Sequence, residues 1–128
     1  MTTEVDWASL RSAAAGATAN SYSPYSNFPV GAAAQTSDGR QFTATNVENA
    51  SYVAGICAET ALVGVLVANG VGRGDIVAVA VTDPAGAPLS PCGRCRQLLH
   101  EIGGGDLPVN EQTMRALLPD AFEPEDLA

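Results

Sequence analysis

The sequence predicts an α/β fold in which a mixed β-sheet carries helices on both faces. A predicted β-hairpin is followed by helix, strand, helix and strand, an order that this arrangement accommodates. The strand at residues 76–82 is Val-rich throughout, as is typical of a central strand buried on both sides. With 128 residues, of which 46% are hydrophobic, the chain can bury a core without disulfides. We therefore expect residues 1–128 to form one domain.

The first half of the chain is expected to contain one helix and the hairpin. Apolar residues recur at helical spacing over residues 6–19, and Asp6 is a suitable N-cap for this helix. Residues 30–36 and 40–47 are the predicted strands of the hairpin. The dipeptide Asp38-Gly39 between them favours a two-residue turn.

The second half is expected to supply two longer helices and the remaining strands. Residues 56–69 form a continuous apolar helix, and residues 92–102 form another that three glycines terminate. Residues 107–110 are predicted as a short edge strand and residues 114–118 as a last helical turn. The alternation of these elements completes the predicted sheet and its two helical layers.

Charge and composition exclude several classes of protein. The formal net charge is −8, all six basic residues are arginines, and they are scattered along the chain. Proteins that bind nucleic acids or anionic membranes usually present a basic patch, so a small neutral ligand is the better expectation. No apolar run reaches the roughly 20 residues of a membrane span, and the N-terminus has no basic flank of a secretory signal. Three cysteines, an odd number, indicate thiols kept reduced in the cytoplasm.

The three cysteines form the most informative pattern in the chain. Cys57 is followed at a distance of two residues by Glu59, and Cys92 and Cys95 form a Cys-x-x-Cys pair preceded by proline. Zinc prefers Cys and His ligands, and three ligands leave one tetrahedral position open, as in catalytic zinc sites. The single histidine, His100, lies more than one helical turn beyond Cys95 and is expected to be a core or surface residue.

Other interpretations of the cysteines stay open at this level. A Cys-x-x-Cys pair is also found in redox sites and in structural zinc knuckles, and Cys57 could be a small buried apolar residue. A non-catalytic, zinc-stabilised domain would need four protein ligands and no glutamate. In a catalytic site, three thiolates on Zn²⁺ carry a net charge of −1. Two helix N-termini, with Arg94 or Arg96 donating to sulfur, are expected to offset that charge.

Further motifs make the resemblance specific. Cys-Ala-Glu together with Pro-Cys-x-x-Cys is the signature of zinc deaminases acting on cytosine or adenine. The chain resembles the short, homotetrameric, zinc-dependent cytidine deaminases along nearly its whole length. The matching stretches are Tyr-Ser-Asn-Phe-Pro-Val-Gly-Ala-Ala (25–33), Asn-Val-Glu-Asn-Ala-Ser-Tyr (46–52), Cys-Ala-Glu (57–59), Ser-Pro-Cys-Gly-Arg-Cys-Arg-Gln (90–97) and Leu-Leu-Pro-Asp-Ala-Phe (117–122).

The resemblance implies a three-layer α/β/α sandwich with a five-stranded mixed sheet. It also implies one Zn²⁺ per chain and hydrolytic deamination of cytidine and 2′-deoxycytidine, a reaction of pyrimidine salvage. Cys57, Cys92 and Cys95 match the zinc ligands, and Glu59 matches the group that moves protons. Many members have arginine directly after this glutamate, whereas this chain has Thr60. The compensation of thiolate charge must therefore come from another group or be weaker.

The same resemblance assigns the substrate-binding residues. Phe28 is expected to stack on the pyrimidine, and the Ala58 N–H to bond the edge of the base. Asn46 and Glu48 are expected to bind the ribose 3′-hydroxyl; on a strand, their spacing puts both side chains on one face. A final group is expected to reach the active site of a neighbouring subunit in the homotetramer: Ala50, Tyr52 and Phe122.

Two enzyme classes compete with this interpretation. Blasticidin S deaminases share the zinc signature and the Pro-Cys-Gly-Arg-Cys-Arg-Gln run, but they lack the ribose-binding Asn-Val-Glu-Asn that this chain has at residues 46–49. Deaminases that edit polynucleotides are disfavoured by the net charge of −8. The sequence thus favours a nucleoside as the substrate.

Overall fold

The computed structural model, which describes residues 4–127, contains one sheet of five strands in the order β2-β1-β3-β4-β5. The strands are β1 (Gly31–Thr36), β2 (Gln41–Thr45), β3 (Ile76–Thr82), β4 (Pro108–Val109) and β5 (Gln112–Thr113). Strand β1 is antiparallel to both β2 and β3, β3 is parallel to β4, and β4 is antiparallel to β5. The predicted five-stranded mixed sheet is confirmed, with the Val-rich strand β3 at its centre.

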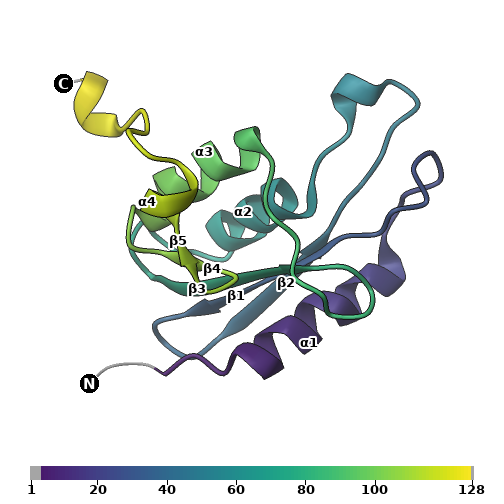
Figure 1. The fold of residues 1–128 in the computed structure, drawn as a ribbon, viewed down its shortest axis with the longest axis horizontal. Coiled ribbons are helices and arrows are strands. Elements are labelled where there is room, and N and C mark those ends of the chain that lie inside the picture. Colours follow the sequence, from purple (N-terminus) through teal and green to yellow (C-terminus); the bar gives the residue numbers. More distant parts are fainter. Residues whose placement is uncertain (1–3, 128) are drawn as a thin grey trace.

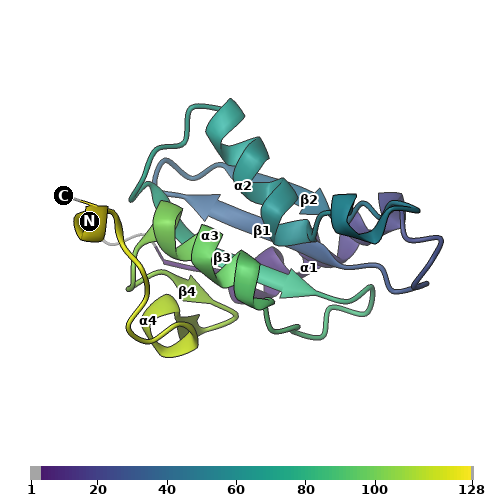
Figure 2. The same ribbon diagram turned by 90° about the horizontal axis from the view of Figure 1, so that it is seen from above.

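Helices cover both faces of this sheet, which confirms the three layers. Helix α1 (Trp7–Ala17) lies across one face, and α2 (Ala58–Ala68) and α3 (Gly93–Gly103) lie side by side on the other (Figures 1 and 2). Helix α4 (Met114–Leu117) follows β5 at the sheet edge. None of the helices in residues 4–127 is long and apolar enough to cross a membrane.

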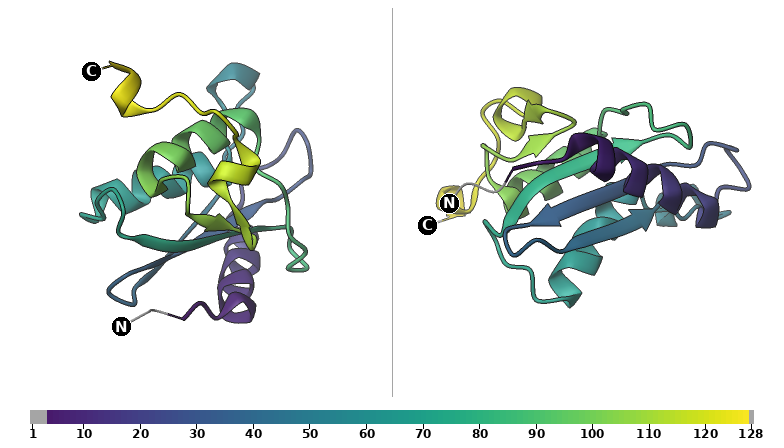
Figure 3. Two further views of the ribbon diagram at one scale, coloured as in Figure 1. Left: turned by 60° about the vertical axis from the view of Figure 1, so that its left-hand side comes forward. Right: turned by 90° about the horizontal axis from the view of Figure 1, so that it is seen from below.

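The core is divided by the sheet into two apolar clusters. Alternate residues of β1 and β3 face opposite sides, so Ala32 and Val79 pack with α2 and α3, whereas Ala33 and Ala80 pack with α1. Helix α1 lies over this face of the sheet, as the view from below in Figure 3 shows, and the strand residues that it contacts are small. A Cβ atom at Gly31 would come within 1.8 Å of the Ala14 carbonyl oxygen of α1. Glycine is therefore required at the start of β1.

The hairpin turn and the last strands differ from the prediction. Thr36 N–H donates to the Arg40 carbonyl, so three residues rather than two form the turn, and Gly39 adopts a φ of +87°. Residues 107–110 were expected to form an edge strand. They supply β4, but β5 pairs with its outer side and occupies the edge.

The loops that lead into α2 and α3 determine where the N-terminal ends of these two helices lie. The chain enters α2 through Cys57 and enters α3 through Cys92, each of which is the N-cap residue of its helix. The 3₁₀ helix Tyr52–Ala54 precedes α2, and a long loop after β3 precedes α3. Because α2 and α3 pack side by side, the segments preceding them meet in space.

Candidate active site

The three cysteine thiols converge where α2 and α3 begin. The Sγ atoms of Cys57, Cys92 and Cys95 all lie within 4.8 Å of one another, and those of Cys57 and Cys92 are 3.8 Å apart. Among residues 4–127 this is the sole cluster of Cys, His, Asp or Glu with such spacing. Soft thiolate ligands in this number suit zinc. The residues present therefore fit a zinc ion bound by three sulfurs.

The surroundings of the thiols affect their ionisation. Burial raises the pKa of the Cys57 thiol, and the neighbouring Cys92 thiol raises it further. Burial also acts to raise the pKa of Cys92, but the Cys95 N–H and the two other thiols outweigh it, so the net pKa is lowered. Metal binding requires deprotonated thiols and releases their protons. The helix N-termini, where the macrodipole is positive, favour that ionised state.

Glu59 lies in the first turn of α2, beside the cysteine cluster. Its side chain is almost fully buried, with 4% of the residue exposed, and it lines the same cavity as Cys57 and Cys92. Burial raises the pKa of this carboxyl group above its ordinary value. A carboxyl group with a raised pKa holds a proton more readily than an exposed one, which suits it to general acid–base catalysis.

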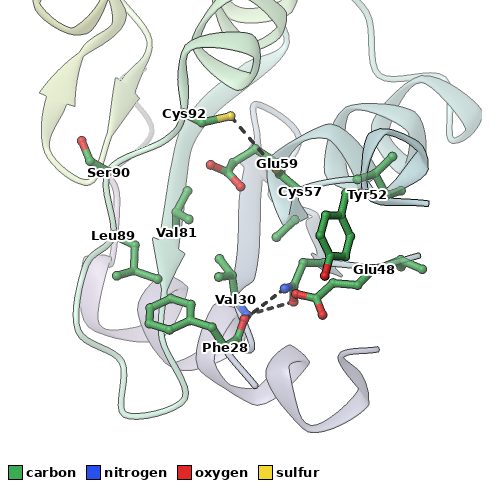
Figure 4. A pocket seen from close by; sticks show the side chains of 15 residues that line it. Phe28, Val30, Glu48, Tyr52, Cys57, Glu59, Val81, Leu89, Ser90 and Cys92 are labelled. Atoms are coloured by element: carbon green, nitrogen blue, oxygen red, sulfur yellow. Dashed lines mark hydrogen bonds between the residues drawn. The ribbon is translucent and has the colours of Figure 1, made fainter. Parts of the chain in front are cut away.

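A cavity of about 440 Å³ opens in front of Glu59 and the thiols. One side of it is apolar, with Phe28, Val81 and Leu89 near one another, while Glu48 and Tyr52 lie on the opposite side (Figure 4). Its size falls within the range of small-molecule sites. The cavity therefore brings together apolar side chains, the carboxyl group of Glu59 and the candidate metal ligands.

Glu48 is oriented by the loop that precedes Phe28. Its carboxylate accepts hydrogen bonds from the backbone N–H groups of Tyr25, at 3.0 Å, and Ser26, at 3.1 Å, and from the Ser26 hydroxyl. The Ser26 hydroxyl and then its N–H lower the pKa of Glu48, against a smaller opposing effect of burial. Glu48 is thus held as a carboxylate at the mouth of the cavity.

Asn46 lines the cavity, but its amide bonds to the chain itself. Its Oδ1 accepts from the Val30 N–H at 3.0 Å and from the Ser21 hydroxyl at 2.6 Å, and its Nδ2 donates to the Phe28 carbonyl at 3.1 Å. Asn46 therefore fixes the loop that carries Phe28. The sequence predicted both residues on one face of a strand, but β2 ends at Thr45, so Asn46 and Glu48 lie beyond it. The loop residues Ser21 and Ser26 that bind them were not predicted.

The residues expected to act between subunits lie outside the cavity or at its rim. Tyr52 lines the rim with 82% of the residue exposed, whereas Ala50 is exposed and does not line the cavity. Phe122 is 56% exposed on the C-terminal segment, and its backbone carbonyl accepts a bond from Gln97 on α3. Within one chain, Phe122 and the cavity are not brought together.

The arginines near the cysteines do not donate to sulfur. Arg96 donates to the carbonyls of Pro91 and Leu117 and to the Ser90 hydroxyl, so it fixes the chain in front of Cys92. Arg94 is exposed. The expected compensation of thiolate charge by these side chains thus has no counterpart in their hydrogen bonds.

A different residue contacts the cysteine sulfur. The Thr60 hydroxyl lies 3.3 Å from Cys95 Sγ, within hydrogen-bonding distance. Sequence reasoning identified Thr60 as a departure from the family pattern but did not assign it this contact. The spacing of Thr60 and Cys57 on one helix turn could have suggested it, since residues three apart share a helix face.

Comparison with known proteins agrees with this geometry. Residues 6–110 match the family described as the cytidine and deoxycytidylate deaminase zinc-binding region. A cytidine deaminase of Mycobacterium tuberculosis is 50% identical over 97% of this chain and 95% of its own length. A cytidine deaminase of Sporosarcina psychrophila is 42% identical over 84% of each chain.

Solved structures extend the agreement to the fold. The cytidine deaminase structure from Mycobacterium tuberculosis superposes with a TM-score of 0.88 at 49% identity, covering 93% of this chain and 98% of that one. The structure from Mycobacterium leprae gives a TM-score of 0.86 at 52% identity, covering 91% of this chain and all of that one. Family match, sequence identity and superposition therefore agree: the chain belongs to the family of zinc-binding cytidine and deoxycytidylate deaminases.

Proposed function

We propose that this chain catalyses the hydrolytic deamination of cytidine and 2′-deoxycytidine to uridine and 2′-deoxyuridine, with release of ammonia. The observation that supports it most directly is the placement of the buried Glu59 beside three convergent thiols at the end of a cavity of nucleoside size. The reaction belongs to pyrimidine salvage, and residues 1–128 would form a single deaminase domain.

Cys57, Cys92 and Cys95 are the residues that would hold the zinc ion. When bound, zinc supplies the Lewis acidity that makes water reactive near neutral pH. Analysis of metal content tests the ligand assignment. Each Cys→Ala variant should lose zinc, whereas a full zinc content in the Cys57→Ala variant would show that Cys57 is not a ligand.

Glu59 would move the protons of the reaction. It takes one from the attacking water and gives it to ring N3 while the water oxygen bonds to C4. It then transfers the remaining proton of that oxygen to the amino group, so that the C4–N bond breaks and ammonia leaves. One carboxyl group with a raised pKa can serve as base and then as acid.

The other lining residues would orient the nucleoside. The base would lie against the apolar side of the cavity, with Phe28 stacked on its ring. Ala58 is the first residue of α2, so its N–H has no partner within the helix and can bond the base edge. Glu48 would accept a hydrogen bond from the 3′-hydroxyl, and Asn46 would donate to it through the second hydrogen of Nδ2, since the first is bonded to the Phe28 carbonyl. A site that binds this hydroxyl leaves the 2′ position free to vary.

A side-by-side measurement of ammonia release tests the substrate class. Cytidine and 2′-deoxycytidine should both react, whereas CMP and blasticidin S should react poorly. Faster release from blasticidin S would favour the alternative of a blasticidin S deaminase. No release from any of them by the zinc-loaded protein would favour a non-catalytic, zinc-stabilised domain.

Free cytosine and the Glu48→Gln variant test the ribose contacts. Removal of the carboxylate charge should raise the KM for cytidine at least about tenfold, because hydrogen bonds to charged groups are among the stronger ones. Zinc content should not change. Free cytosine reacting as well as cytidine would show that the ribose contacts do not matter.

We also propose a homotetramer in which Ala50, Tyr52 and Phe122 complete the site of a neighbouring subunit. The exposure of Tyr52 and Phe122 supports this assembly, as does the absence of Phe122 from the residues that line the cavity of its own chain. Zinc binding by three free cysteines supports a reducing compartment, the cytoplasm. The net charge of −8 argues against nucleic acids as partners.

A further inference from the structure

Asn110 forms a joint between the sheet and the apolar side of the cavity. Its Oδ1 accepts from the Val81 N–H at 2.9 Å, and its Nδ2 donates to the Leu89 carbonyl at 2.7 Å. The Leu89 N–H in turn donates to the Val81 carbonyl at 2.8 Å. One amide thus joins two segments that also bond to each other.

The Asn110 side chain supplies a hydrogen bond to β3 where the backbone pairing with β4 has ended. Val109 is the last residue of β4 and pairs with Val79 of β3, and the Asn110 N–H donates to the Val79 carbonyl. Val81 lies two residues further along β3, beyond the end of β4. Its N–H is therefore bonded by the Asn110 side chain where a longer strand would have supplied a backbone carbonyl.

Both anchored residues line the cavity. The Val81 and Leu89 side chains lie next to Phe28 on the apolar side of the space in front of Glu59 (Figure 4). The following residues, Ser90 and Pro91, are anchored separately by Arg96. The loop after β3 thus has two independent anchors, one at the apolar side of the cavity and one in front of the metal ligand Cys92.

We propose that Asn110 is a positioning residue that sets substrate affinity by holding Leu89 against the nucleobase. It touches neither the reacting atoms nor the cysteine ligands, so its loss should alter KM rather than kcat or zinc binding. This inference rests on the proposed function for its kinetic readout but not for its structural one.

The Asn110→Asp variant is the first test. Aspartate keeps the shape and tolerates the φ of +51° at this position, but it places an acceptor against the Leu89 carbonyl. KM for cytidine should rise about tenfold, with kcat within about threefold of the parent and one zinc per chain. The control is Asn69→Asp, the same exchange at an exposed residue whose side chain bonds only the Val65 carbonyl of its own helix. The control should leave KM unchanged.

A double-mutant cycle tests whether Asn110 acts through Leu89. Leu89→Ala should raise KM by itself, and adding Asn110→Asp should raise it little further, because the two changes remove one function. Additive effects of the two substitutions on KM would overturn the proposal. An unchanged KM in Leu89→Ala would also overturn it, and that result does not depend on whether an Asn110 variant folds. Equal losses of kcat, zinc and affinity in Asn110→Asp would indicate general destabilisation and would also overturn it.

Amide hydrogen exchange supplies a readout without turnover. In the zinc-loaded Asn110→Gly variant, which keeps the positive φ and lacks the amide, exchange at Val81 should accelerate at least about tenfold. Ala80, which pairs with Ala33 of β1, should be unaffected. Unchanged exchange at Val81 would show that the Asn110 side chain does not hold this strand. Accelerated exchange in a protein that releases no ammonia from cytidine would contradict only the proposed function.

Discussion

At the scale of single residues, burial separates the two glutamates of the cavity. Glu59 is enclosed and its pKa is raised, whereas Glu48 is held by the Ser26 hydroxyl and backbone N–H groups and its pKa is lowered. One group is therefore suited to proton transfer and the other to accepting hydrogen bonds as a stable anion.

Replacing Glu59 by glutamine tests this division. Glutamine fills the same volume but cannot carry the proton, so kcat for cytidine should fall by at least about 10²–10⁴-fold. Zinc content and the far-ultraviolet circular dichroism spectrum should match the parent protein. Turnover near the parent rate would mean that another group moves the protons.

The Thr60 hydroxyl provides a second test at this scale. It lies 3.3 Å from Cys95 Sγ, and groups that bond to metal ligands commonly contribute about 10–100-fold to metal affinity. Thr60→Val, which keeps the shape without the hydroxyl, should weaken zinc binding about tenfold in competition with a chromophoric chelator. Thr60→Ser should retain the affinity, and equal affinities for valine and serine would rule out a role for the hydroxyl.

At the scale of elements, the β4–β5 hairpin shows where sequence patterns stop being informative. Its turn consists of Asn110 and Glu111, with φ values of +51° and +70°, a combination typical of a type I′ turn. Asn-Gly would have signalled such a turn, but Asn-Glu does not. Strands of two residues also carry no periodicity, so β5 was not identified from its own residues.

Glu111 therefore carries backbone strain that glycine would relieve. The left-handed region costs a non-glycine residue roughly 1–2 kcal/mol, partly offset by the greater unfolded-state entropy of glycine. Its ion pair with Arg11 is long, at 3.8 Å, and Glu111 itself is exposed, so the pair contributes little. Glu111→Gly should raise the free energy of unfolding by about 0.5–1 kcal/mol in urea titrations. Glu111→Gln, which removes the charge and keeps the strain, is the control and should not be the more stable of the two.

The longer elements were predictable because their patterns are strong. Helices α1, α2 and α3 and the strands β1 and β3 lie within a few residues of the predicted ranges. The functional site was less completely predictable from the sequence than the fold. The cysteines and Glu59 stand in a recognisable motif, whereas the partners of Arg96 and the amide of Asn110 depend on contacts between distant segments. Those contacts are set by packing, which no local pattern encodes.

At the scale of the whole molecule, the C-terminal segment raises the question of assembly. It lies over the outer end of α3, where His100 and Glu123 are 2.9 Å apart and Gln97 bonds the Phe122 carbonyl (Figure 1). These contacts fix the backbone and leave the Phe122 ring exposed. Burial of such a ring against a neighbouring subunit is worth about 1.5–3 kcal/mol.

Subunit mixing tests whether the active site is shared between subunits. The Phe122→Ala variant should raise KM for cytidine without loss of zinc. When it is mixed with inactive Glu59→Gln chains under conditions of proven exchange, sites with an intact Glu59 that receive Phe122 from the other chain should regain affinity. A fully active monomer by light scattering, or no recovery after exchange, would show that each chain completes its own site.

The meeting of Cys57 and Cys92 joins parts of the chain that are 35 residues apart. An ion held there ties the start of α2 to the start of α3 in the native fold alone, so by mass action each tenfold rise in free zinc above its dissociation constant adds about 1.4 kcal/mol to stability. The melting temperature should therefore climb with the logarithm of buffered zinc and fall with a chelator, while magnesium, which prefers oxygen ligands, should have no effect. A melting temperature independent of zinc would contradict this linkage. If stability depends on zinc in this way, the supply of zinc governs the lifetime of the folded protein as well as its catalytic rate.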